Sequence, residues 1–254
     1  MIVYQKQFIR IAETWNGEEV IPGRVDLVRR FQQIQPHEGT FCREFYSIVL
    51  DLKKDESALL AAMKRGTRYE IRRASAVNTV YEYWHCVNLE LLEEFSDYFD
   101  RFAAQRAQPK LDRRRLSLLA RDGAVSISRM TLETVSSEVE VIWHAYHRTE
   151  TRATLLHSAS LFRNNSNSSD RNRVGSANRL HHWKDILLFK AEGMSIYDFG
   201  GWYQGSKDRA RLQINKFKAE FGGTIERTFI CEHAVTLKAG LFLRLRHLFL
   251  GDAI

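Results

Sequence analysis

The 254-residue sequence contains only three prolines and three cysteines, and it has no long uncharged apolar stretch. So few prolines argue against a disordered or linker-rich chain. The lack of a run of about 18 apolar residues excludes a membrane-spanning helix, and the first residues lack the basic and apolar segments of a signal peptide. Cys42, Cys86 and Cys231 lie far apart without metal-ligand spacing. We therefore expect a cytoplasmic protein with reduced cysteines and no disulfide framework.

Charge and composition describe an ordinary globular protein with a basic balance. Apolar residues make up 44% of the chain and charged residues 27%, which suffices for a packed core. There are 38 Lys and Arg residues against 31 Asp and Glu, a net charge of +7. This excess favours anionic partners such as phosphates, nucleic acid or a membrane surface, and charge alone does not distinguish among them.

Hydrophobic periodicity predicts a mixed α/β fold. Apolar residues at spacings of three and four indicate helices, and short aromatic or β-branched runs indicate strands. Short linkers predict an antiparallel meander, and the helix that follows it predicts a crossover to a parallel strand. We expect a strand-and-loop extension over residues 1–50 and one domain over 51–254. The expected strands are 44–51, which crosses the boundary between the two parts, and 78–84, 124–133, 138–147, 152–162, 194–199 and 224–231. The expected helices are 56–76, 89–105, 112–121, 177–192 and 209–221.

The most informative segment precedes the helix expected from Ala177. Residues 163–173 are polar and lack periodicity, which predicts a loop. Unpaired backbone N–H groups and the helix dipole make such a helix start an anion site. Gly175 permits close approach of a ligand, and Arg173 adds charge. The alternative is that Ser176 simply caps the helix at the end of a solvated basic loop.

Several segments together resemble one superfamily. They are 174–186 (VGSANRLHHWKDI), 189–193 (FKAEG), 197–201 (YDFGG), 217–223 (FKAEFGG) and the basic helix 63–74 (MKRGTRYEIRRA). These motifs resemble the GNAT acyltransferases, and within them the branch related to the Fem peptidoglycan-bridge aminoacyltransferases. The resemblance covers residues 45–232. It implies a GNAT-like mixed sheet, with an antiparallel meander and parallel splayed strands flanked by helices.

The resemblance implies an enzyme, an N-acyltransferase with an acyl-coenzyme A thioester as co-substrate. The acceptor would be an amine of an amino sugar, an amino acid, or a cell-envelope or natural-product intermediate. The family's pyrophosphate loop usually begins with Arg or Gln, whereas Asn172 stands there in this chain. An aminoacyl-tRNA donor of the Fem type is therefore the alternative, although the chain has room for only one such domain and no tRNA-clasping hairpin is visible. The residues expected to hold the donor pyrophosphate are Arg171, Arg173, Val174, Gly175, Ser176, Ala177 and Asn178.

Three side chains are candidates for the reacting end of the site. Asp198 ends a strand beside two glycines, and its alternative role is to cap the following turn. Lys218 occupies the lysine position of the Fem-like Phe-Lys-x-x-Phe-Gly pattern, and Tyr203 would protonate a leaving thiolate. GNAT catalysis relies on orientation of donor and acceptor, with a backbone N–H of the strand at 152–162 stabilising the oxyanion.

The acceptor site is expected to be basic. The resemblance implies a substrate role for the helix at 56–76, although an exposed charged face is the commoner use of such arginines. No metal is expected, because the histidines lack a helical i, i+4 spacing and the cysteines are distant. The residues expected to bind the acceptor are Arg68, Arg72, His144, His157, Gly200 and Gly201.

Two further possibilities stay open at this point. The basic, amphipathic segment 237–250 would either contact a membrane surface or pack on its own domain. A degenerate GNAT domain, without catalysis, would bind nucleic acid or a partner through its basic face and would gain no thermal stability from coenzyme A esters.

Overall fold

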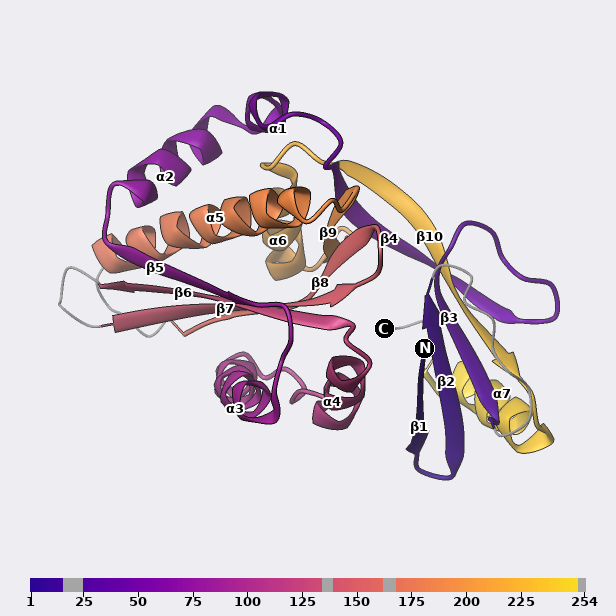
Figure 1. Cartoon of the computed structure of the whole chain (residues 1–254). Helices are drawn as coiled ribbons and strands as arrows, with labels where there is room; N and C mark the ends of the chain where they lie inside the picture. Colours follow the sequence, from indigo (N-terminus) through magenta and orange to yellow (C-terminus); the bar gives the residue numbers. More distant parts are fainter. Residues whose placement is uncertain (16–24, 134–138, 162–167, 251–254) are drawn as a thin grey trace. The chain divides into compact units, whose positions relative to one another are not determined.

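The computed structural model describes residues 1–15, 25–133, 139–161 and 168–250 (Figure 1). The chain divides into two compact units. One consists of Met1–Ser47 and Glu226–Ile254, and the other of Ile48–Ile225. The segment after Glu226, which was expected in the second domain, clusters with the N-terminal residues. The reason is that the strand Thr224–Ala234 lies between two strands of the N-terminal segment, Leu27–Gln33 and Phe41–Asp51.

The first unit is built on strands in the order β1-β2-β3-β10-β4. The β1–β2 and β3–β10 pairs are antiparallel, and β2 pairs with β3 in parallel. Its buried Glu13 accepts hydrogen bonds from Tyr4 and Arg29, so the charge is paired inside the unit. The elements are β1 (Ile2–Lys6), β2 (Ile9–Trp15), β3 (Leu27–Gln33), β4 (Phe41–Asp51), β10 (Thr224–Ala234) and α7 (Leu237–Leu250).

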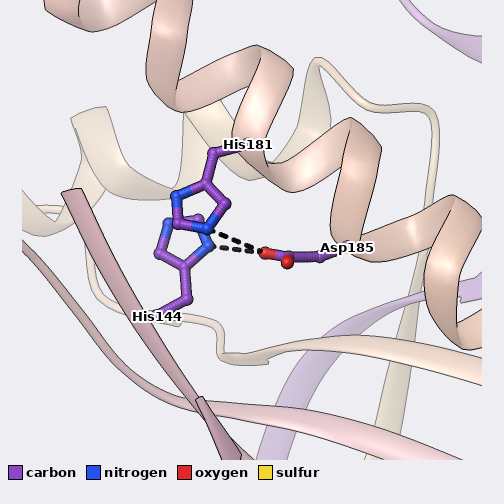
Figure 2. A group of neighbouring side chains, drawn as sticks. All are labelled: His144, His181 and Asp185. Atoms are coloured by element: carbon purple, nitrogen blue, oxygen red, sulfur yellow. Dashed lines mark hydrogen bonds and ion pairs between the residues drawn. The ribbon is translucent and has the colours of Figure 1, made fainter. Parts of the chain in front are cut away.

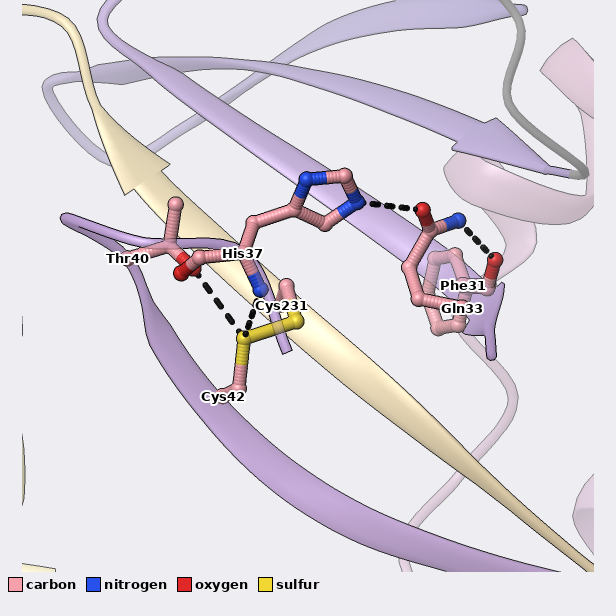
Figure 3. The surroundings of a disulfide bond; sticks show 6 residues. All are labelled: Phe31, Gln33, His37, Thr40, Cys42 and Cys231. Carbon is pink, nitrogen blue, oxygen red and sulfur yellow. Dashed lines mark hydrogen bonds between the residues drawn. A yellow bond between two sulfur atoms is a disulfide. The ribbon is translucent and has the colours of Figure 1, made fainter. Parts of the chain in front are cut away.

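A disulfide joins Cys42 on β4 to Cys231 on β10, so the expectation of reduced cysteines is wrong for this pair (Figure 3). The two residues are separated by 189 positions, and only the adjacency of β4 and β10 brings their Cα atoms to 4.1 Å. Spacing in the sequence carries no sign of that adjacency. The backbone N–H of His37 and the hydroxyl of Thr40 both contact Cys42 Sγ, at 3.4 and 3.0 Å. Cys86 is an exposed free thiol.

The second unit contains the antiparallel meander and the parallel crossover, which confirms the predicted fold class. Its strands follow the order β4-β9-β8-β7-β6-β5. Helices α3 and α4 cover one face of the meander, and α1, α2, α5 and α6 lie on the other (Figure 1). The elements are α1 (Glu56–Ala62), α2 (Arg65–Ser75), β5 (Thr79–Trp84), α3 (Leu89–Gln105), α4 (Arg113–Arg121), β6 (Val125–Glu133), β7 (Val139–Arg148), β8 (Arg152–Ser160), α5 (Ser168–Ala191), β9 (Ile196–Gly201) and α6 (Arg209–Ala219).

The single helix expected over 56–76 is divided into α1 and α2. Met63 and Lys64 have extended ψ angles near 150°, which ends one helix and starts the next. The backbone N–H of Lys64 donates to the carbonyl of Glu220 at 2.9 Å, so the chain after α6 occupies the break. Gly222 there has φ +82°, and a Cβ would overlap the carbonyl of Ala62. Gly222 thus serves close packing against α1, and Gly223 of the same motif lies against the carbonyl of Val49 on β4.

Candidate active site

Strands β8 and β9 pair in parallel over three positions only. The register is Arg152 with Ile196, Ala153 with Tyr197, and Thr154 with Asp198. Beyond these positions no pairing between the two strands is found in the described residues, although each continues to Ser160 and Gly201 respectively. The strands therefore part. This is the splayed parallel pair that the resemblance implied, and among the described residues β9 offers the rest of β8 no further ladder partner.

Asp198 stands where the strands part, and its carboxylate is held on both oxygens. It is 1% exposed and accepts from the Arg152 guanidinium at 3.1 Å and from the backbone N–H of Gly200 at 2.7 Å. Gly200 has φ +72°, and a Cβ there would lie 2.7 Å from the carbonyl oxygen of Leu155. The buried carboxylate thus fixes the turn that Gly200 makes at the end of β9.

Lys218 reaches the same turn from α6. Its Nζ donates to the carbonyl of Gly201 at 2.6 Å. Burial lowers the pKa of Lys218 to about 8, and the negative charge of Asp198 opposes that shift. The structure thus brings Asp198, Lys218, Gly200 and Gly201 together at the end of β9. An ammonium group on the edge of parted strands is suited to stabilise negative charge that develops there.

Tyr203 lies in the loop that follows. Its backbone exchanges hydrogen bonds with the side chain of Asn215, at 3.1 and 2.7 Å. Its ring lies under Arg211, 5.4 Å from the guanidinium carbon, and its hydroxyl lies against Gly205. The contacts of this side chain are thus with its own loop and α6.

Helix α5 overturns the expected pyrophosphate loop. The helix begins at Ser168, not near Ala177. Only the first four N–H groups of a helix lack an intrahelical acceptor, so Gly175 and Ser176 lie beyond the anion-binding turn. The carbonyl of Gly175 accepts from Arg179 at 3.2 Å, and the side chain of Asn178 contacts His144 at 3.1 Å. A loop built on Gly175 is therefore wrong.

Some of the residues that were expected to hold the donor pyrophosphate nevertheless line one cavity of about 380 Å³ between α2, α5, β5 and β6. Arg173, Ser176 and Ala177 form part of its wall, whereas Val174 is buried in the core and Arg171 does not line it. Arg73 from α2 completes the polar side.

The basic residue of α2 at this cavity is Arg73, which sequence reasoning missed. It pairs with Glu70 at 2.7 Å and donates to the hydroxyl of Ser176 at 2.5 Å. Arg68 instead donates to backbone carbonyls at the end of α1, and Arg72 donates to the carbonyl of Arg68 at 3.4 Å. Neither lines the cavity, so the expectation that they bind the acceptor gains no support. Arg73 follows Arg72 directly, and only the packing of α2 on α5 distinguishes them.

A cluster of buried side chains lies beneath α5 (Figure 2). His144 Nδ1 is 2.7 Å from Asp185 Oδ2, and His181 Nε2 is 3.7 Å from the same oxygen. Tyr146 donates to that oxygen at 2.7 Å and lies 2.8 Å from the hydroxyl of Tyr197. Periodicity placed the strand and the helix but gave no sign that these polar groups face one another.

The geometry of this cluster does not suit a metal. The rings of His144 and His181 are stacked, with centroids 3.8 Å apart and planes 10° from parallel. Their nitrogen lone pairs therefore lie in parallel planes and do not converge on one ion. Burial holds the pKa values of His181 and of the neighbouring His182 well below the usual range, so both rings are neutral. The cluster is a hydrogen-bonded core network.

His144 and His157 do not share a site, which corrects the expected acceptor set. His144 faces α5 and is fully buried. His157 packs against Phe99 of α3 on the opposite face, with ring centroids 4.8 Å apart. Burial lowers the pKa of His157 to about 4 and that of His147 to about 3.

Comparison with known proteins finds likeness in structure alone. No family model matches the chain, and no curated protein matches it by sequence. The solved structure of FemX superposes with a TM-score of 0.59 at 13% identity, over 79% of this chain and 63% of FemX. The chain therefore shares the fold of FemX, in line with the GNAT-like mixed sheet that the motifs implied. The C-terminal domain of a putative lysylphosphatidylglycerol synthetase from Agrobacterium fabrum superposes with a TM-score of 0.53 at 13% identity, over 87% of this chain and 72% of that one. Because the superposition covers 63% of FemX, this chain spans less than two thirds of the length of FemX.

Proposed function

We propose that this chain transfers an aminoacyl group from aminoacyl-tRNA to an amine or hydroxyl acceptor. The observation that carries the proposal is the Lys218 ammonium group at the edge where β8 and β9 part. The Fem-type fold supports it, as do the resemblances of 197–201 and 217–223 to Fem enzymes. The lysylphosphatidylglycerol synthetase likeness extends the candidate acceptors from amines to lipid hydroxyls.

In this reaction the acceptor attacks the carbonyl carbon of the aminoacyl ester. An amide or ester bond forms, the bond to the 3′ oxygen of the tRNA breaks, and that oxygen takes the proton that the acceptor loses. Lys218 in its charged form donates a hydrogen bond to the tetrahedral oxyanion. Asp198 and Arg152 are positioning residues, because they hold the turn whose carbonyl at Gly201 orients Lys218.

The acyl-coenzyme A donor is the weaker alternative for this fold. It rested on a pyrophosphate loop at residues 171–178, and that segment lies within α5. A tRNA donor is also favoured by the net charge of +7, because phosphate contacts dominate affinity for nucleic acids.

The test measures transfer of label by the full chain. Radiolabelled aminoacyl-tRNA is mixed with phosphatidylglycerol vesicles or with an amine-bearing peptidoglycan peptide, and labelled acetyl-coenzyme A replaces the tRNA in a parallel reaction. We expect transfer from tRNA that Lys218→Ala abolishes and Lys216→Ala, on the exposed side of the same helix, leaves unchanged. Transfer from acetyl-coenzyme A alone would refute the donor. No transfer and no tRNA binding would refute the proposal.

Helix α7 bears an apolar face that is open to solvent. Its buried face carries Ala239 and Leu243, and Lys238 pairs with Asp26 at 2.9 Å. None of the described helices is long and apolar enough to cross a membrane. The exposed leucines of this face are Leu237, Leu241, Leu245 and Leu248.

We propose that this leucine face makes a peripheral contact with an anionic lipid surface, where Arg244 adds attraction to the headgroups. Co-sedimentation with phosphatidylglycerol vesicles tests it. We expect Leu241→Glu to lower the bound fraction several-fold, and Val139→Glu, at an exposed apolar position of the other unit, to have no effect. Binding that is equal in both variants contradicts the proposal.

A further inference from the structure

The cavity between α2 and α5 has the size of a small-molecule site. Its volume of about 380 Å³ falls within the usual range for ligand pockets. One side is apolar, formed by Val77 at the end of α2 and Leu132 on β6. The other side is polar, with Asn172 and Ser176 from α5 and Thr79 from β5. A bare phosphate ion would fill only a small part of it.

The two arginines of the wall differ in their partners. Arg73 is compensated by Glu70 at 2.7 Å and held by Ser176. Arg173 forms no ion pair with any residue in the described part of the chain, and its Nε is buried without a hydrogen-bond partner there. A guanidinium is always charged, and a buried donor without an acceptor costs free energy. The wall therefore presents the guanidinium of Arg173 as a cation that no carboxylate in the described part of the chain compensates.

We propose that this cavity binds a nucleoside monophosphate unit of a substrate, with its phosphate on Arg173. Planar guanidinium groups bind phosphate oxygens in pairs. The apolar side accommodates a base, and the hydroxyl and amide groups opposite can hydrogen-bond a ribose or a base edge. The inference rests on the proposed function, since the end of an aminoacyl-tRNA supplies such a unit.

Isothermal titration of the full chain with adenosine monophosphate, adenosine and glycerol 3-phosphate tests the proposal. We expect adenosine monophosphate to bind at least tenfold more tightly than adenosine. Arg173→Leu should remove that advantage and leave adenosine unchanged, and Arg65→Leu, at an exposed arginine of α2 away from the cavity, should change nothing. Circular dichroism confirms that both variants fold.

The proposal is overturned by no nucleotide binding, by equal binding of nucleotide and nucleoside, or by phosphate binding that Arg173→Leu does not weaken. Tighter binding of glycerol 3-phosphate than of the nucleotide also overturns it, and assigns the cavity to a lipid headgroup. Transfer activity separates this inference from the proposed function. If Arg173→Leu transfers label with an unchanged KM for aminoacyl-tRNA, the cavity assignment fails and the function stands. Nucleotide binding without any transfer keeps the cavity and removes the function.

Discussion

The charge of Lys218 makes the proposed mechanism dependent on pH in a direction that the structure sets. Its pKa is lowered to about 8, so the ammonium form predominates below that pH and disappears above it. A group with a pKa of about 8 is about 90% protonated at pH 7 and about 10% at pH 9. If the charged form stabilises the oxyanion, kcat/KM falls about tenfold between those values.

Two substitutions change the alkaline limb in opposite directions. Lys218→Arg keeps a positive charge at all accessible pH values, so the decline near pH 8 should vanish. Asp198→Asn removes the negative charge that favours the ammonium form of Lys218. In this variant kcat/KM should therefore begin to decline at a lower pH than in the wild type. Lys216→Arg should have the wild-type profile, because Lys216 is exposed.

The assay is the pH dependence of kcat/KM for label transfer, combined with an NMR titration of the lysine side chains. The titration reports the pKa of Lys218 even in the absence of substrate. An acceptor amine also titrates, but its loss of a proton raises the rate with pH, so the two effects have opposite signs. An alkaline decline that persists unchanged in Lys218→Arg would refute the role of this lysine.

Three predictions concern stability. Because burial lowers the pKa of His157 to about 4 while the unfolded value is near 6.5, stability falls as pH drops through that window. Urea unfolding should show that His157→Phe removes up to about 2 kcal/mol of the loss between pH 7 and pH 5, and an unchanged loss would contradict this. Reducing the Cys42–Cys231 bond, or Cys42→Ser, should lower the unfolding free energy by up to about 5 kcal/mol, because the bond closes a very long loop; an unaltered denaturation midpoint would count against the bond. Gly222→Ala should cost more than Gly193→Ala in thermal unfolding, since both have φ +82° but only Gly222 lies against a carbonyl; equal costs would mean that backbone strain alone matters.

The likeness of this chain to Fem enzymes extends over one part of FemX. The chain covers 63% of FemX. We therefore measure binding of charged tRNA before transfer, so that a lost tRNA contact can be distinguished from a lost acceptor contact. Binding of charged tRNA should weaken steeply as salt is raised, in line with the release of counterions. Binding that is insensitive to salt would point away from phosphate contacts.

Local sequence determined the elements whose signals are complete within a few turns. Helix α3 spans Leu89–Gln105 as expected, because its apolar stripe is regular and Asn88 caps it through its side chain. Helix α4 likewise follows the capping Asp112. The meander was predictable from its alternation and short linkers, and the order of the elements predicted a parallel crossover after it, whereas the parting of β8 and β9 was implied only by the resemblance to the GNAT acyltransferases.

Only the tertiary structure decided where the polar groups meet. The first turns of α5 look like a loop in the sequence, yet the helix extends to Ser168. Helix α2 packs on α5, and Arg73 of α2 donates to Ser176. His144, Tyr146 and Asp185 come together from β7 and α5, elements far apart in the chain. Helix signals depend on neighbours three or four residues away and strand signals on alternation at every second residue, whereas ion pairs, disulfides and cavities depend on which elements the core places side by side. Periodicity along one chain contains the first kind of information and not the second.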